Sequence, residues 1–135
     1  MQKAIEPLSN GNGKPAPVSA SSVAREWRLP AELKELVEAE PSAVAELTEI
    51  YLRDSASRLE ILKAACHAGD FKTIRLQAHS VKGSSLQIGA EGVAHLCAAL
   101  EVCERPSAEQ RHQLLRSIEE EFEHIGRAMH AAVAA

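Results

Sequence analysis

The sequence has 135 residues, which is enough for one hydrophobic core and too little for two independent ones. Nineteen acidic residues against fifteen basic ones give a formal charge of −4. Such a chain is a poor non-specific binder of nucleic acid, because that affinity comes mainly from neutralising phosphates. Aromatic residues make up only 3% of the chain, which argues against a stacking platform for single-stranded bases.

The sequence shows no feature of a membrane or secreted protein. Its apolar stretches are shorter than a bilayer span, and its N-terminus lacks the charged-then-apolar layout of a signal peptide. Cys66, Cys97 and Cys103 are an odd number of cysteines without a CxxC pair, which is typical of reduced thiols. We therefore expect a cytoplasmic location and no direct insertion into a membrane.

The N-terminal segment differs in composition from the rest of the chain. Residues 10–22 are rich in Gly, Asn, Pro and Ser, and such a stretch cannot bury apolar surface. We predict a flexible N-terminal tail or linker over residues 1–28 and a single folded domain over residues 29–135.

Helical periodicity dominates the predicted domain, and no strand pattern is present. A short helix is predicted between Pro30 and Pro41, where the prolines mark its two ends. Four longer helices are predicted at about 41–67, 71–88, 90–103 and 107–132. Long helices joined by short loops predict an all-α fold, an antiparallel up-down four-helix bundle with a short extra N-terminal helix.

The predicted helix 71–88 has two distinct faces. At 100° per residue, one face is apolar and suited to the core: Phe71, Ile74, Ala78, Val81, Ser85 and Ile88. The other face is basic and carries Lys72, Arg75, His79, Lys82 and Gly83. Leu76 borders the basic face, and Leu86 lies on it two turns after His79. This pattern predicts that His79 is accessible to solvent and flanked by apolar side chains.

The neighbours of His79 suit contact with an anion. Lys82 lies one turn onward on the same face, where its ammonium can approach a group attached to the imidazole. Gly83 costs the helix about 1 kcal/mol relative to alanine, and its place beside the histidine indicates close approach of another protein surface. A lone exposed histidine or a basic helix face is usually inert. The combination of His79, Lys82 and Gly83 on one face favours a functional site.

The segment His79-Ser80-Val81-Lys82-Gly83-Ser84-Ser85 resembles the HxxKGSS signature of histidine-containing phosphotransfer (HPt) domains. The resemblance extends to Gly69-Asp70 before this segment and to Gly89-Ala90, Leu96-Cys97 and Leu100-Glu101 after it. It covers about residues 30–130. The family fold is a four-helix bundle, in agreement with the periodicity.

The resemblance implies a role for each residue of the site. His79 would accept a phosphoryl group on Nε2 from a receiver-domain aspartate and pass it to another receiver. Lys82 would stabilise the phosphoryl oxygens, and Glu101 would orient the imidazole through Nδ1. The receiver would dock on Lys72, Arg75, Leu76, Gly83 and Leu86. An ordinary surface carboxylate remains the alternative for Glu101, and an inert surface remains the alternative for the docking residues.

We expect no cofactor or metal on this chain, and Mg²⁺ on the partner receiver domain. The sequence has no nucleotide-binding motif, so no autonomous ATP-dependent kinase activity is expected. The expected partners are receiver domains of response regulators, a hybrid histidine kinase, or both. The chain would act as a monomer. It would be free-standing or the C-terminal part of a hybrid histidine kinase, which would tether it to a membrane-bound sensor.

Three alternatives stay open. The chain could be the phosphoacceptor domain of a chemotaxis-type histidine kinase. It could be a non-catalytic helical protein-interaction domain, although the complete set of His79, Lys82 and Gly83 argues against this. A metal- or redox-active bundle enzyme would need converging ligands, and His95, Cys97 and Cys103 match no zinc spacing.

Overall fold

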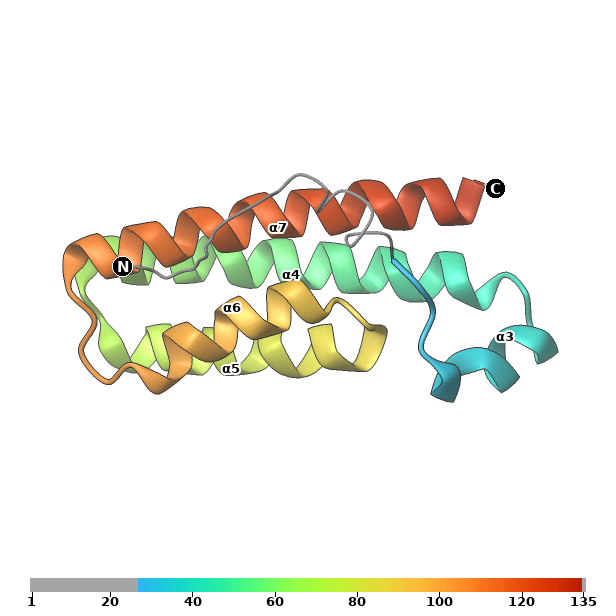
Figure 1. Cartoon of the computed structure of the whole chain (residues 1–135), viewed down its shortest axis with the longest axis horizontal. Coiled ribbons are helices and arrows are strands. Elements are labelled where there is room, and N and C mark those ends of the chain that lie inside the picture. The colour runs from blue at the N-terminus through green and yellow to red at the C-terminus, as the bar shows by residue number, and fades with distance from the viewer. Residues whose placement is uncertain (1–26, 135) are drawn as a thin grey trace, which may run out of the picture.

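The computed structural model describes residues 27–134, and all regular elements in this part are helices. In chain order they are η1 (Ala31–Leu33), α3 (Lys34–Ala39), α4 (Ala43–Ala68), α5 (Phe71–Ile88), α6 (Glu91–Val102) and α7 (Ala108–Ala134). Figure 1 shows the four long helices side by side, with η1 and α3 at one end. No helix in the described range is long and apolar enough to cross a membrane.

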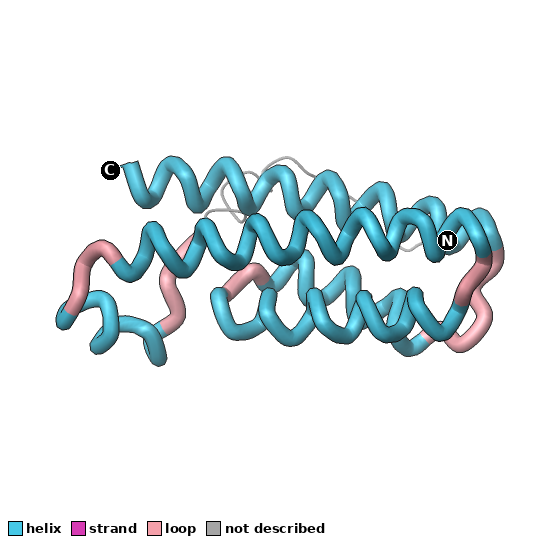
Figure 2. Tube along the Cα trace, turned by 180° about the vertical axis from the view of Figure 1, so that it is seen from behind, coloured by secondary structure: helices cyan, strands magenta, loops and turns pink. Residues whose placement is uncertain are grey.

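The four long helices form an antiparallel bundle. Helices α4 and α6 each pack along both α5 and α7, whereas the backbones of α5 and α7 do not lie side by side. Helices α5 and α7 therefore occupy opposite corners of the bundle. Figure 2 shows the short connections from behind. The predicted up-down four-helix bundle with a short N-terminal helical segment is confirmed.

Two glycines and one aspartate determine where α5 begins and ends. Gly69 (φ 70°) ends α4 and Gly89 (φ 83°) ends α5, both in the left-handed region that favours glycine. The Asp70 carboxylate accepts a hydrogen bond from the Thr73 backbone N–H at 3.2 Å and so caps the start of α5. These signals explain why the predicted bounds of this helix match the structure.

The core runs along the inner faces of the four long helices. It includes Leu62, Ile74, Val81, Leu100, Ile118 and Met129, each almost completely buried. A polar contact lies within it, because the Tyr51 hydroxyl hydrogen-bonds the Ser85 Oγ at 2.7 Å. The core face of α5 is therefore fixed against α4 by both apolar packing and a hydrogen bond.

Trp27 was predicted to lie in the tail, and that prediction is wrong. Its side chain is buried, and its Nε1–H donates to the Ile88 carbonyl at 2.7 Å. This bond satisfies one of the carbonyls that a helix end leaves without a partner. The composition of the preceding residues gave no hint of the contact, which joins positions 61 apart in sequence. Residues 1–26 of the predicted tail lie outside the described residues.

Candidate functional site

His79 lies midway along the exposed face of α5. Its side chain is 66% exposed, while the neighbouring Ala78 and Val81 are completely buried. These two residues hold the helix against the core and leave the histidine directed outward. Arg75 and Lys72, one and two turns earlier, are also exposed.

The carboxylate of Glu101 contacts both His79 and Lys82 on α5. Its Oε2 lies 2.6 Å from His79 Nδ1, and its Oε1 lies 2.6 Å from Lys82 Nζ. A carboxylate can only accept a hydrogen bond, so the neutral imidazole places its proton on Nδ1. The lone pair of Nε2 then remains available for chemistry.

The electrostatics of this cluster favour an ionised Glu101. The hydrogen bond from Lys82 lowers the pKa of the carboxyl, burial opposes that effect, and the hydrogen bond from His79 lowers the pKa further. Oε1 is buried, and the Lys82 ammonium is the positive group beside it. The cluster therefore contains a fixed anion between two nitrogen donors.

Cys97 lies in the core near this cluster and is unsuited to nucleophilic chemistry. It is completely buried. Burial, and to a lesser degree the Glu101 carboxylate, raise the pKa of its thiol to about 12. Because the thiolate is the nucleophilic form, His79 is the better nucleophile of the two.

The arrangement can accept a phosphoryl group. It offers an exposed imidazole with an oriented lone pair and a lysine ammonium within the same cluster. Phosphoryl transfer depends mainly on positioning and on charge stabilisation. Residues 27–134 contain no group of three His, Cys, Asp or Glu side chains that could hold a metal ion.

The structure brings most of the predicted docking residues together around His79. A hollow of about 560 Å³ is lined by Lys72, Arg75, Leu76, His79, Lys82, Glu101 and Val102. Leu86 does not line this hollow and faces another one, between η1, α4 and α5. A Cβ at Gly83 would have no atom within 4 Å, so this glycine leaves open surface beside the histidine.

Two residues beside the site were missed from the sequence. Val102, at the end of α6, is 76% exposed and lines the hollow at His79. The guanidinium of Arg105 lies 5.6 Å from the centroid of the Phe71 ring, at the start of α5. The position of Val102 directly after Glu101 was the available signal, but only the packing of α6 against α5 shows that Val102 lines the hollow at His79 and that Arg105 lies beside Phe71 and Arg75.

Comparison with known proteins gives a consistent result. Residues 46–133, more than half of the chain, match the family model described as Hpt domain. The crystal structure of histidine-containing phosphotransfer protein B from Pseudomonas aeruginosa PAO1 superposes with a TM-score of 0.68 at 31% identity, covering 78% of this chain and 94% of that one.

Two plant proteins are also similar. Histidine-containing phosphotransfer protein 1 of Arabidopsis thaliana is 30% identical over 88 residues, which are 63% of this chain and 57% of that protein. Histidine-containing phosphotransfer protein 4 of the same plant is 38% identical over 82 residues, covering 58% of this chain and 65% of that protein. The chain thus spans less than two thirds of the length of either plant protein.

Proposed function

This chain belongs to the Hpt domain family, and we propose that it relays a phosphoryl group between receiver-domain aspartates through His79. The observation that carries the proposal is the contact of Glu101 with both His79 Nδ1 and Lys82 Nζ, each at 2.6 Å. This contact presents an oriented imidazole and a cation on one exposed surface. The names of the similar proteins, which are all histidine-containing phosphotransfer proteins, support the same role.

In the proposed reaction, the Nε2 lone pair of His79 attacks the phosphorus of an aspartyl phosphate. The P–N bond forms as the P–O bond to the aspartate breaks, and the electron pair of that bond leaves with the aspartate carboxylate. The positive charge that develops on the ring is stabilised by Glu101 at Nδ1. Transfer to a second receiver reverses these steps. Lys82 would move toward the phosphoryl oxygens, and the receiver would supply Mg²⁺.

The proposed partners are receiver domains of response regulators or of a hybrid histidine kinase. The chain would act as a monomer in the cytoplasm, either free-standing or joined to a sensor kinase. The exposed face of α5 supports the proposal of a protein partner, because the apolar residues Leu76 and Leu86 on it are 60% and 58% exposed. Apolar side chains beside a polar site are typical of a docking surface.

The proposal is tested by incubating the purified chain with a phosphorylated receiver domain that has been separated from its phosphate donor. Wild type and His130→Gln should acquire acid-labile, base-stable phosphate, whereas His79→Gln should acquire none. His130 is a matched control because it is an exposed histidine on α7, away from α5.

Equal labelling of His79→Gln would contradict the assignment of the phosphoacceptor. A folded wild-type protein that accepts phosphate from none of several receivers would favour the non-catalytic interaction domain. Labelling only by an ATP-bound kinase domain would favour the phosphoacceptor domain of a chemotaxis-type kinase.

A further inference from the structure

Two differently charged regions flank His79 along α5. The first lies toward the start of the helix and is mainly basic. It consists of the hollow at His79 and an adjoining hollow of about 620 Å³ that Phe71, Arg75 and Arg105 help to line. We call this region the basic end of the face.

The cations of the basic end are held in place by contacts of their own. Arg105 lies over the Phe71 ring at 5.6 Å, and Arg75 Nη1 donates to the Glu104 carbonyl at 3.4 Å. Glu104 also contributes a carboxylate to the lining, whereas the Glu101 carboxylate is already paired with Lys82. With Lys72 beside Arg75, positive charge exceeds negative charge here, and Val102 adds an exposed apolar side chain.

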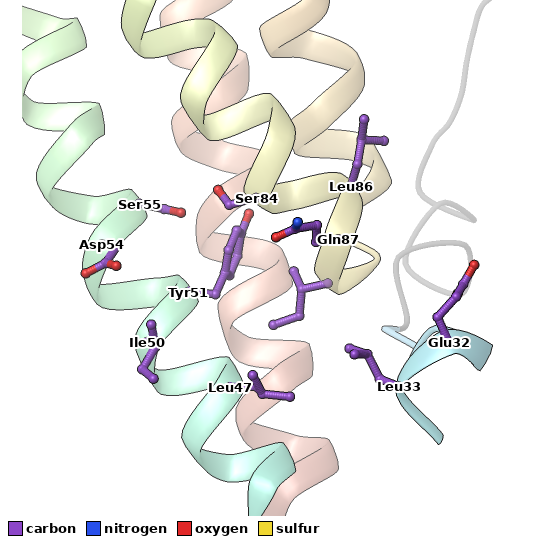
Figure 3. A pocket seen from close by; sticks show the side chains of 11 residues that line it. Glu32, Leu33, Leu47, Ile50, Tyr51, Asp54, Ser55, Ser84, Leu86 and Gln87 are labelled. Carbon is purple, nitrogen blue, oxygen red and sulfur yellow. The ribbon is translucent and has the colours of Figure 1, made fainter. Parts of the chain in front are cut away.

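The second region lies toward the end of α5 and is apolar with an acidic rim. It is a hollow of about 640 Å³ between η1, α4 and α5, lined by apolar side chains that include Leu33, Ile50 and Leu86 (Figure 3). Among residues 27–134, the charged residues in its lining are Glu32 on η1 and Asp54 on α4, both exposed. They stand on opposite sides of the hollow. We call this region the acidic end of the face.

A protein that docks on His79 covers both ends. Leu86 follows His79 by two turns on the same face, a distance of about 10 Å along the helix axis, and Phe71 precedes His79 by about 12 Å. A standard interface buries about 800 Å² on each partner, which corresponds to a disc about 30 Å across. An interface centred on the imidazole therefore extends over Phe71 and Leu86, which line the basic end and the acidic end respectively.

We propose that this polarity selects the receiver domain and fixes its orientation on the bundle. The inference rests on the proposed phosphotransfer function. The matching receiver places an apolar side chain next to a lysine or arginine in the acidic end, and an acidic side chain against Arg75 and Arg105. A receiver turned end for end would bring like charges together at both ends, which disfavours that orientation and partners with the opposite polarity.

The test reverses the charges at each end separately. Glu32→Lys/Asp54→Lys alters the acidic end, and Arg75→Glu/Arg105→Glu alters the basic end. Matched controls on α7 are Glu120→Lys/Glu123→Lys and Arg116→Glu/Arg127→Glu, which make the same changes in net charge at exposed positions of the helix at the corner opposite α5. The measurement is the second-order rate constant of transfer from a receiver that phosphorylates the wild type.

Each variant of the face should lower that rate constant by about tenfold or more at low salt, and the loss should shrink at high salt. Both controls should stay within about twofold of the wild type. Replacing an acidic side chain of the receiver by lysine should rescue Arg75→Glu/Arg105→Glu and leave Glu32→Lys/Asp54→Lys unrescued. Thermal unfolding of each variant shows that the bundle is intact.

Wild-type rates in both face variants would overturn the polarity while leaving the phosphotransfer function in place. A lower rate constant in the variant of only one end would also overturn the proposed polarity, because fixing the orientation of the receiver requires both charged ends. Failure of the wild type to accept phosphate from any receiver would instead contradict the proposed function. The two failures are therefore distinguishable.

Discussion

Glu101 orders the reactive residues before any phosphoryl group arrives. It lies on α6, yet it contacts His79 and Lys82 on α5 at 2.6 Å each. The neighbouring helix therefore both selects the imidazole tautomer and holds the lysine near it. An arriving phosphoryl group would compete with the Glu101 carboxylate for the Lys82 ammonium, so the lysine can shift to the new anion without leaving the site.

The lowered pKa of Glu101 predicts a pH-dependent contribution to stability. A carboxyl whose pKa is lower in the folded state stabilises the protein at pH values above its ordinary pKa of 4.5. This stabilisation is lost as the pH falls through the pKa of the folded state. Glu101→Gln should therefore cost about 1 kcal/mol or less at pH 7. Urea unfolding of both proteins should give a difference that vanishes in acid. A difference that grows in acid would contradict the assignment.

Gly83 predicts opposite effects of substitution on stability and on transfer. A Cβ here meets no atom within 4 Å, so Gly83→Ala should raise the free energy of unfolding by about 0.5–1 kcal/mol through helix propensity. Gly83→Leu should remain folded and slow phosphotransfer by about tenfold, because its side chain would stand between the imidazole and the receiver. Urea unfolding and the transfer assay measure the two effects. Wild-type transfer by Gly83→Leu would show that the partner does not approach closely here.

At the scale of elements, α5 links the reactive face to the rest of the bundle. Its start is capped by Asp70, its end is closed by Gly89 and Trp27, and its last turn is tied to α4 through the Tyr51–Ser85 hydrogen bond. Each of these contacts restrains the helix that carries His79. Changes at either end of α5 should therefore affect stability without touching the reactive atoms.

Trp27 provides a direct test of the closure at the end of α5. Trp27→Phe removes the hydrogen bond to the Ile88 carbonyl and should lower the free energy of unfolding by about 1–3 kcal/mol. Circular dichroism is the suitable measurement, because Trp27 is the only tryptophan in the chain and its fluorescence is lost in the variant. Unchanged stability would show that the segment before η1 contributes little to the domain.

Tyr51 predicts a loss of stability in alkali. Burial raises the pKa of its hydroxyl from 10.0 to about 12, more than the hydrogen bond to Ser85 lowers it. The folded state therefore holds this proton more tightly, so the contribution is complete below pH 10 and is lost as the pH rises to about 12, amounting to about 2–3 kcal/mol. Between pH 10 and 12, the free energy of unfolding of Tyr51→Phe should fall less steeply with pH than that of the wild type. The difference in slope should correspond to one proton. Parallel curves of unfolding free energy against pH for the two proteins would contradict the burial of the Tyr51 hydroxyl.

The sequence predicts the elements better than the contacts between them. The bounds of α5 follow from local signals, namely Asp70, Gly89 and the spacing of apolar residues. The place of Trp27 depends on Ile88, far away in sequence, and the exposure of Val102 depends on how α6 ends beside α5. The pairing of Glu101 with His79 was available only through the family resemblance, because periodicity does not align two helices.

At the scale of the whole molecule, the bundle separates reactive and structural surfaces. Because α5 and α7 lie at opposite corners, the outer face of α7 stays remote from a partner bound at His79. One end of the bundle, with η1, contributes the acidic rim of the docking face, and the α6–α7 connection contributes Arg105 at the other. The docking face on α5 therefore also includes charged groups from η1, from α4 and from the α6–α7 connection.

The measurement that decides the role of this geometry is the position of phosphorus on the imidazole. The chain would be labelled with ¹⁵N in its histidines, phosphorylated by a receiver, and examined by NMR for coupling between phosphorus and the ring nitrogens. The predicted result is phosphorus on Nε2 of His79, with Nδ1 still protonated toward Glu101. Phosphorus on Nδ1, or on another of the six histidines, would contradict it.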